Sequence, residues 1–574
     1  MGSPDILNDV LHRVLRCRRI AASSQRLSDM GRNYDHLGKD ELVALLQARD
    51  RRDATKFGLV WEADEIEREK AINSDFVALD LDPGLSSGVA PWRNLIIEGD
   101  NFDALRHLNM TFKGRVKCIY IDPPYNTGNK DFVYNDHFVE KEDLWRHSTW
   151  CEFMFQRLTL AKDLLREDGV IFVSIDDNEL FHLGLLMDKV FGAGNFVANI
   201  VWQKRTSPDA RLNLGAAHDY VLAYANALSA LKPTLNKIPL SGKRTGDFKN
   251  PDNDSRGVWA SVDLTGQTGH ATPEQFFIIE TPSRKKLSPP PGRCWALSEK
   301  TFKNLVKENR IWFGKNGDSR PRIKKFLSES EGSTTWTWWT NEEVGHNQEG
   351  TKELNDVMSG SDIFSNPKPT RLIERILQIA TNPGDLILDF FAGSGTTAHA
   401  VQKMNKADCG NRRFILVSST EATEDAPDKN LCRDVCAERV RRVITGYRNA
   451  KGEDVEGLGG DFAYLRCRKI ASSRLLDIEH EQVWTALQLI HRPHLLPYVE
   501  APFLMAEGGE DAALIYIPRF EKSILPRLRE AVRRHASVII YSWQPGLLRQ
   551  HLRADHVQHE AIPESLVRRF GLKK

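Results

Sequence analysis

The residues that could do chemistry in this chain include the tetrad Asp122-Pro123-Pro124-Tyr125, which directly follows the apolar, β-rich run 117–121. Two consecutive prolines indicate a strand that ends in a rigid turn. The Asp122 carboxylate and the Pro123 carbonyl can accept the two hydrogens of an exocyclic amine, and Tyr125 can stack on a flat ring. Such a site would hold an aromatic amine with its nitrogen lone pair available for attack. The alternative is a turn in which Asp122 only caps the chain.

A second candidate is the loop that runs from Asp389 and Phe390 to Gly393, Ser394 and Gly395. The two glycines let the backbone approach a ligand closely, and Asp389, at the end of an apolar run, can bind an amine or a hydroxyl. The spacing Gly-x-Gly-x-x-Ala also fits a dinucleotide fingerprint, which is a weak signal when it stands alone. The loop predicts a site for a small cofactor, and an NAD oxidoreductase is one alternative.

The elements that must position these residues follow the pattern of a parallel sheet. The apolar run 94–98 ends in Gly99-Asp100-Asn101 and is followed by a predicted helix over 102–112 and by the strand before Asp122. This order forms a βαβ unit, and ligands bind beyond the carboxyl ends of its strands. Asp100 is therefore placed to accept a hydrogen bond from a nucleotide. A helix N-cap is the alternative role for Asp100.

Three further acidic residues leave more than one interpretation open. Glu421 follows the predicted strand 413–418 and could bind ribose hydroxyls. Asp176 and Asp177 follow another predicted strand and suggest a metal site. The run Asp-Asp-Asn-Glu also suits the first turn of a helix, and this second interpretation is preferred. No metal site is predicted.

The composition sets limits on the class of protein. The chain has 574 residues, 41% of them hydrophobic and 27% charged, which suits a folded protein with several domains. Lys and Arg (79) nearly balance Asp and Glu (78), so the net charge gives no general argument for nucleic acid. The eight cysteines form no Cys-x-x-Cys pair, and neither a zinc ribbon nor a disulfide framework is indicated. Without a signal peptide or a membrane-length apolar run, a soluble cytoplasmic protein is expected.

The chain divides into five predicted regions. The middle one is rich in Gly, Pro, Ser and Thr, and basic residues alternate in it with tryptophans, which suits contacts to phosphates and bases. An ordinary irregular insertion with solvated charges is the alternative. The regions are a helical N-terminal region (1–92), a catalytic half (93–225), an insert (226–355), a cofactor half (356–448) and a small C-terminal α/β domain (449–574).

Several motifs together resemble a known family. Asp122-Pro-Pro-Tyr125 resembles catalytic motif IV of S-adenosylmethionine-dependent amino-methyltransferases, in the form typical of adenine-N6 enzymes, and Asp389 to Gly395 resembles their motif I. The order of catalytic motif, insert and cofactor loop resembles β-class DNA amino-methyltransferases, and within them the modification (Mod) subunits of Type III restriction–modification systems. The other stretches that carry the resemblance are Glu98-Gly-Asp-Asn101, Tyr134-Asn135-Asp136, 168–175, 200–204 and Asn366-Pro-Lys-Pro369.

The resemblance implies a fold, a reaction and partners. The fold is α/β, a circularly permuted, Rossmann-like methyltransferase core with an inserted target-recognition region. The reaction is methyl transfer from S-adenosylmethionine to adenine N6 in double-stranded DNA after base flipping. A homodimer is implied, and a restriction–helicase subunit or another phage-defence partner is a possibility. Cytosine-N4 methylation, RNA or protein methylation, and a non-catalytic DNA-specificity subunit stay open as alternatives.

The resemblance also implies roles for individual residues. The catalytic residues are Asp122, Pro123, Pro124 and Tyr125. The residues that would bind the methyl donor are Asp100, Asn101, Asn366, Lys368, Pro369, Asp389, Phe390, Gly393, Ser394, Gly395 and Glu421.

Overall fold

The computed structural model describes most of the chain after residue 74. The described ranges are 75–128, 146–207, 214–240, 245–330, 332–361, 363–423, 426–507 and 512–571, with the backbone of β4 (Val133–Tyr134) and β5 (His137–Phe138). The helices expected before residue 75 lie outside the described residues, and so do Asn135 and Asp136 of the polar loop.

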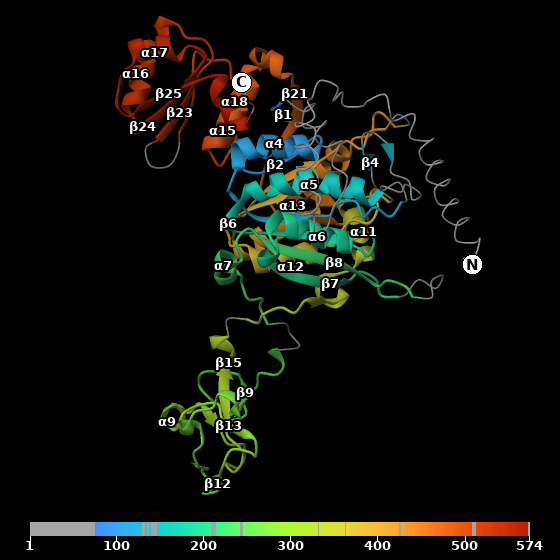
Figure 1. Ribbon diagram of the computed structural model, residues 1–574, viewed down its shortest axis with the longest axis vertical. Helices are drawn as coiled ribbons and strands as arrows, with labels where there is room; N and C mark the ends of the chain where they lie inside the picture. The colour runs from blue at the N-terminus through green and yellow to red at the C-terminus, as the bar shows by residue number, and fades with distance from the viewer. Residues whose placement is uncertain are drawn as a thin grey trace, which may run out of the picture. The chain divides into compact units, whose positions relative to one another are not determined.

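A ten-stranded sheet forms the centre of the molecule (Figure 1). Six neighbouring strands, from β21 to β6, are parallel, while β1 and β8 run antiparallel to the strands beside them. The order across the sheet is β1 (Phe76–Ser87), β21 (Phe462–Ile470), β2 (Leu95–Glu98), β18 (Arg413–Ser418), β17 (Leu386–Asp389), β3 (Val116–Ile121), β6 (Leu165–Ile175), β8 (His218–Ala225), β7 (Phe196–Gln203) and β16 (Trp338–Trp339).

Strands from the two predicted halves of the core alternate in this sheet. β17 and β18 lie between β2 and β3, with Ile387 opposite Cys118 and Ile415 opposite Leu95. The strands that end near Asp389 and Ser418 therefore lie beside those that end near Asp100 and Asp122. The central strands read as continuous apolar runs because helices cover both faces of the sheet.

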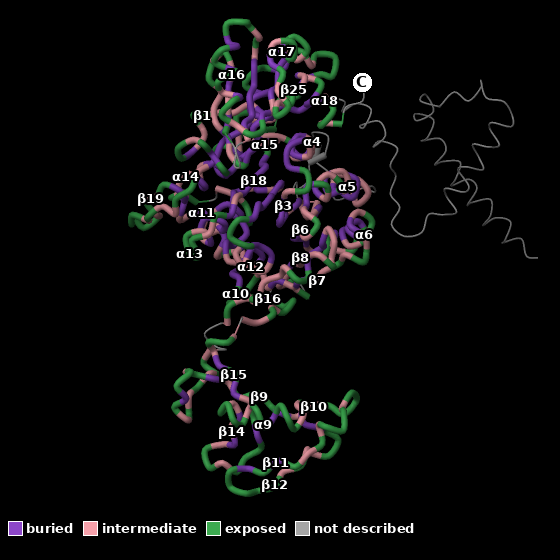
Figure 2. Tube along the Cα trace, turned by 90° about the vertical axis from the view of Figure 1, so that its left-hand side faces the viewer, coloured by how far each residue is buried: buried purple, intermediate pink, exposed green. Residues whose placement is uncertain are grey.

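Two helical layers bury the sheet (Figure 2). One layer contains α4 (Asn101–Phe112), α5 (Arg146–Leu164), α6 (Leu180–Phe191) and α15 (His480–His491). The other contains α11 (Asn347–Met358), α12 (Thr370–Ala380), α13 (Thr396–Asp408) and α14 (Glu438–Thr445), which continues from a π-helical turn at Cys432–Ala437. Leu372, Val401 and Val440 of the second layer belong to the same buried core as Cys118 and Tyr120 of β3.

The prediction of a helical region over 1–92 is wrong where the structure describes it. Residues 76–79 are a buried apolar run, and Phe76–Ser87 forms edge strand β1. The stretch Asp82-Pro83-Gly84 lies in this strand, where the pairing register shifts, and Asp82 Oδ1 accepts from the Gly84 and Leu85 amides. The partner strand β21 is distant in sequence, so local patterns did not indicate the pairing.

The region after residue 449 is not separate from the main sheet. It begins with β20 (Asp454–Glu456), which pairs with β19 (Gly446–Arg448), and continues into β21 between β1 and β2. The expected strand–helix–strand pattern follows, in a second sheet of four strands. Its elements are β22 (Leu504–Glu507), β23 (Ala512–Ile517), α16 (Leu525–Arg533), β24 (Ser537–Ser542), α17 (Pro545–His551), β25 (Val557–Ala561) and α18 (Glu564–Phe570).

The middle region has its own small core of Leu264, Ile279, Trp295, Phe302 and Ile311. Its elements are β9 (Trp259–Asp263), β10 (Thr265–Gln267), β11 (Ile279–Glu280), β12 (Lys286–Leu287), β13 (Arg293–Trp295), α9 (Glu299–Lys307), β14 (Ile311–Trp312) and β15 (Arg322–Phe326). The predicted limits of 226 and 355 are too wide. α7 (Leu228–Leu231) contacts β6, β16 joins the main sheet, α10 (Asn341–Val344) contacts α12, and α11 contacts α14.

Among the described helices, none combines the length and the apolar character that a membrane span needs.

The position of β21 predicts that its apolar residues support the main core. Leu465 is fully buried and lies between Leu81 of β1 and Ile97 of β2. Leu465→Ala should lower the free energy of unfolding by about 2–5 kcal/mol, measured by urea denaturation, because it leaves a cavity. The control Leu476→Ala, at a leucine that is 75% exposed, should change it little. Equal values for the two variants would contradict this placement of β21.

Candidate active site

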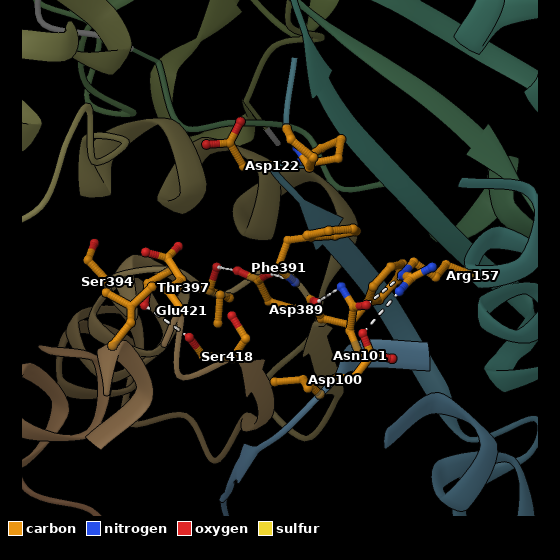
Figure 3. A pocket seen from close by; sticks show the side chains of 18 of the residues that line it. Asp100, Asn101, Asp122, Arg157, Asp389, Phe391, Ser394, Thr397, Ser418 and Glu421 are labelled. Carbon is orange, nitrogen blue, oxygen red and sulfur yellow. Dashed lines mark hydrogen bonds and ion pairs between the residues drawn. The ribbon is translucent and has the colours of Figure 1, made fainter. Parts of the chain in front are cut away.

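The carboxyl ends of four central strands open into one cleft of about 2700 Å³. Asp100 follows β2, Asp122 follows β3, Asp389 ends β17 and Ser418 ends β18 (Figure 3). The predicted residues that line the cleft are Asp100, Asn101, Asp122, Pro123, Pro124, Tyr125, Asn366, Lys368, Asp389, Phe390, Gly393, Ser394 and Glu421. Pro369 and Gly395 are the sequence neighbours of lining residues. The sheet thus brings the two predicted groups to one edge.

An ion pair joins the two halves of the cleft. Lys368 Nζ donates to Asp122 Oδ2 over 2.5 Å and lies 5.1 Å from the centre of the Tyr125 ring. The other carboxylate oxygen, Asp122 Oδ1, is buried and has no hydrogen-bond partner in the described part of the chain. The sequence analysis put Lys368 with the donor, whereas its ammonium group lies on Asp122. A contact between residues 246 positions apart left no local signal.

The turn after β3 is held by its neighbours. Trp150 Nε1 of α5 donates to the Pro124 carbonyl over 2.7 Å, and Asn126 has a left-handed backbone with φ 56°. The Tyr125 hydroxyl is buried and, within the described ranges, is not in hydrogen-bond geometry with another group. Burial and then the negative charge of Asp122 hold the pKa of Tyr125 well above its usual value. Tyr125 is therefore a neutral aromatic wall beside Asp122.

The Asp389 loop has a buried carboxylate at its start. Asp389 Oδ2 accepts from Thr397 Oγ1 over 2.5 Å, and Oδ1 accepts from the Phe391 amide over 3.0 Å. Burial raises the pKa of Asp389 to about 7, and these two hydrogen bonds oppose the shift. Gly395, with φ 76°, caps α13 against the backbone of Cys436, which a Cβ would approach to 3.2 Å. Glycine is favoured at this position because its φ is positive and because a Cβ would crowd the Cys436 backbone.

Arg439 supports the loop from behind and was not selected from the sequence. Its guanidinium is fully buried and donates from Nη1 to Thr396 Oγ1 over 2.8 Å and to Ser394 Oγ over 3.1 Å. Burial lowers the pKa of Arg439 to about 10. An arginine in an amphipathic helix is usually solvated, so its sequence position gave no indication of this role.

Asp100 and Asn101 have structural partners in the cleft. Asp100 Oδ1 accepts from the Phe102 and Asp103 amides, so the N-cap role that was left open is present. Arg157 of α5 donates to Asp100 Oδ2 over 3.1 Å and to Asn101 Oδ1, while Asn101 Nδ2 donates to the Phe390 carbonyl over 3.0 Å. The Asp100 side chain is still 53% exposed toward solvent. Arg157 was also missed by the sequence analysis.

The acidic residues at the far end of the cleft differ in their partners. Glu421, with φ 52°, is paired with Lys429 over 2.9 Å. Glu98, at the end of β2, accepts from Asn430 Nδ2 over 2.9 Å and from the Tyr464 hydroxyl. Both line the cleft.

Asp176 accepts from the Asn178 amide in the turn before α6, in agreement with the preferred helix-start interpretation.

Comparison with known proteins finds relatives among DNA-modifying enzymes. The chain is 35% identical over 440 residues to the Mod subunit of the Type III enzyme StyLTI of Salmonella typhimurium (71% of this chain, 66% of the relative). It is 33% identical over 340 residues to the Type II methyltransferase M.KpnI of Klebsiella pneumoniae (56% and 79%), and 55% identical over 293 residues to M1.MboII of Moraxella bovis (51% and 82%). The match spans 58–66% of the length of the StyLTI, EcoPI and EcoP15I Mod subunits.

Among solved structures, the cytosine-N4-specific PvuII DNA methyltransferase is 12% identical, with 64% of this chain and 98% of that chain covered and a TM-score of 0.32. A family model described as DNA methylase matches residues 116–423, which is more than half of the 574 residues. This match includes the Asp122 turn, the middle region and the Asp389 loop, and on these grounds the chain belongs to the DNA methylase family.

Proposed function

We propose that this protein transfers a methyl group from S-adenosylmethionine to N6 of adenine in double-stranded DNA. The observation that carries the proposal is the state of Asp122: one oxygen is held by Lys368, and the other is buried at the cleft beside Tyr125 without a partner in the described residues. A buried acceptor without a donor costs about 1–3 kcal/mol, which an incoming amine would recover.

The base side of the cleft suits a flat ring with an exocyclic amine. Asp122 Oδ1 and the Pro123 carbonyl would accept the two N6 hydrogens, and the Tyr125 ring would lie against the base. A paired base cannot reach this turn from inside the duplex, so the base must leave the stack. With the amine held in this way, its lone pair points away from the acceptors. No general base is needed before the transfer, because the proton can leave afterwards.

The donor side suits a small cation. Asp100, Asp389 and Glu421 line the cleft around the glycine loop, and carboxylates favour a positively charged ligand over a phosphate. When bound, S-adenosylmethionine supplies the methyl group. Asp389 and Gly393 would contact the donor, and the loop fixed by Arg439 would orient it toward Asp122. Much of the rate gain would come from this alignment of donor and amine.

Cytosine N4 is the competing target, because it offers a similar amine to the same acceptors. Aspartate at position 122 supports adenine, since the cytosine enzymes that this chain resembles more often have serine there. The exposed basic residues Arg320, Arg322 and Lys325, together with the exposed Trp336, support DNA contact by the middle region. By similarity to Type III Mod subunits, a second copy of the chain and a restriction subunit are the proposed partners.

Removal of the Asp122 carboxylate tests the proposed reaction. Asp122→Ala should abolish methylation and leave S-adenosylmethionine affinity within a few-fold, because it removes the acceptor of the base and no donor contact. Single-molecule sequencing of DNA from cells that express each variant would detect N6-methyladenine at one short motif. Asp163→Ala, at a surface carboxylate paired with Lys113, is the control and should keep full methylation. Methylation by Asp122→Ala, or N4-methylcytosine in the wild type, would contradict the proposal.

The second prediction separates two roles for Lys368. If its ammonium group serves to hold Asp122, Lys368→Met should lower kcat at least tenfold while the Kd for S-adenosylmethionine, measured by calorimetry, changes little. Lys368→Arg should recover part of the rate, because a guanidinium can also reach a carboxylate. A large loss of donor affinity with unchanged kcat would instead assign Lys368 to the donor.

The third prediction concerns pH. The pKa of Asp389 is raised to about 7, so the carboxylate that attracts a cation forms only as the pH rises through that value. The affinity for S-adenosylmethionine should therefore increase from pH 5.5 to 8, up to about tenfold per pH unit below the pKa. Asp389→Asn should bind more weakly at pH 8 and show a flatter profile. A wild-type affinity that is independent of pH would exclude this role.

A further inference from the structure

Two histidines meet a buried glutamate on the outer side of the catalytic turn. His147 lies in the first turn of α5, Glu179 is the N-cap residue of α6, and His182 lies in the first turn of α6. His147 Nδ1 is 2.6 Å from Glu179 Oε1, and His182 Nδ1 is 2.9 Å from Glu179 Oε2. The two imidazole rings stack with their centres 4.7 Å apart. One atom from each residue therefore lies within 4.8 Å of the other two.

Not every close contact in this cluster is a hydrogen bond. Glu179 Oε2 and His182 Nδ1 are both buried and have no hydrogen-bond partner among the described residues, although they are only 2.9 Å apart. The two atoms are close enough for an ion pair but do not meet hydrogen-bond geometry. The Glu179 side chain is completely buried, and a buried carboxylate requires compensation of its charge. A cation that both atoms coordinate would supply this compensation.

We propose that His147, Glu179 and His182 bind one divalent transition-metal ion of the zinc, cobalt and nickel class. Two imidazoles and a carboxylate suit these ions, whereas Mg²⁺ and Ca²⁺ prefer oxygen ligands only. Ligands at about 2.0–2.2 Å from a tetrahedral ion lie roughly 3 Å or more from one another, so small side-chain movements suffice. The histidine side chains are 38% and 36% exposed, which gives the ion access and leaves a position for water.

The site would act on the catalytic turn through Asn126. Asn126 Nδ2 donates to Glu179 Oε1 over 2.5 Å and to the Arg146 carbonyl over 3.2 Å. Asn126 follows Tyr125 directly and has the left-handed backbone that ends the turn. An ion bound to Glu179 would hold the carboxylate that accepts from Asn126. Groups that hydrogen-bond to metal ligands orient those ligands, so the ion and the position of Asn126 would be linked. The site would therefore stabilise the turn structurally and would take no part in the transfer itself.

The test uses the full chain without a polyhistidine tag, first treated with a chelator. Co²⁺ titration followed by visible absorption, and native mass spectrometry with Zn²⁺, should show one ion per chain. His182→Asn and His147→Asn should each weaken Zn²⁺ binding at least tenfold and remove the visible Co²⁺ bands. His270→Asn, at an exposed histidine of the middle region, is the matched control and should bind like the wild type. The melting temperature should rise with Zn²⁺ in the wild type and in this control only.

Two results would overturn the proposal. One is the absence of a stoichiometric ion in the wild type at micromolar Zn²⁺, which would make the cluster a proton-sharing contact. The other is equal binding by His182→Asn and the wild type. Because His182 is partly exposed, its variant is expected to fold, and circular dichroism would verify this. These measurements do not use methylation, so their result is independent of the proposed function.

Discussion

The ion pair between Asp122 and Lys368 joins the two halves of the cleft. Lys368 holds one carboxylate oxygen, and the other is buried with no hydrogen-bond partner among the described residues. The two residues are 246 positions apart, and β3, which leads to Asp122, pairs with β17 from the other half of the core. The contact therefore joins two parts of the chain that only the fold brings together.

The same adjacency places the Asp389 loop beside the Asp122 turn. Asp389 ends β17 and Asp122 follows β3, so parallel neighbours deliver both carboxylates to one edge of the sheet. Arg157 of α5 and Arg439 of α14 then hold these loops, Arg157 with part-buried hydrogen bonds and Arg439 with buried ones. Rigid elements hold the side chains on both sides of the cleft, and alignment of two ligands is what a transfer between them requires.

The sequence predicted the parts of this site that have local patterns. The Asp122 turn and the Gly393–Gly395 loop combine unusual residue types at short spacing, and the sheet neighbours followed from their order. The pairing of β1 with β21 was missed, because strand pairing between distant segments leaves no periodic signal. Arg157 and Arg439 were not selected from the sequence, and the contact of Lys368 with Asp122 was not foreseen, for the same reason: each contact depends on a partner that only the fold brings near.

The catalytic turn lies between two carboxylates whose charges are balanced in different ways. Asp122 is paired with the ammonium group of Lys368. Glu179, which holds Asn126 on the other side, faces two imidazoles, and burial raises its pKa to about 7. The turn is therefore tied at both ends, Asp122 through the ammonium group of Lys368 and Asn126 through the carboxylate of Glu179.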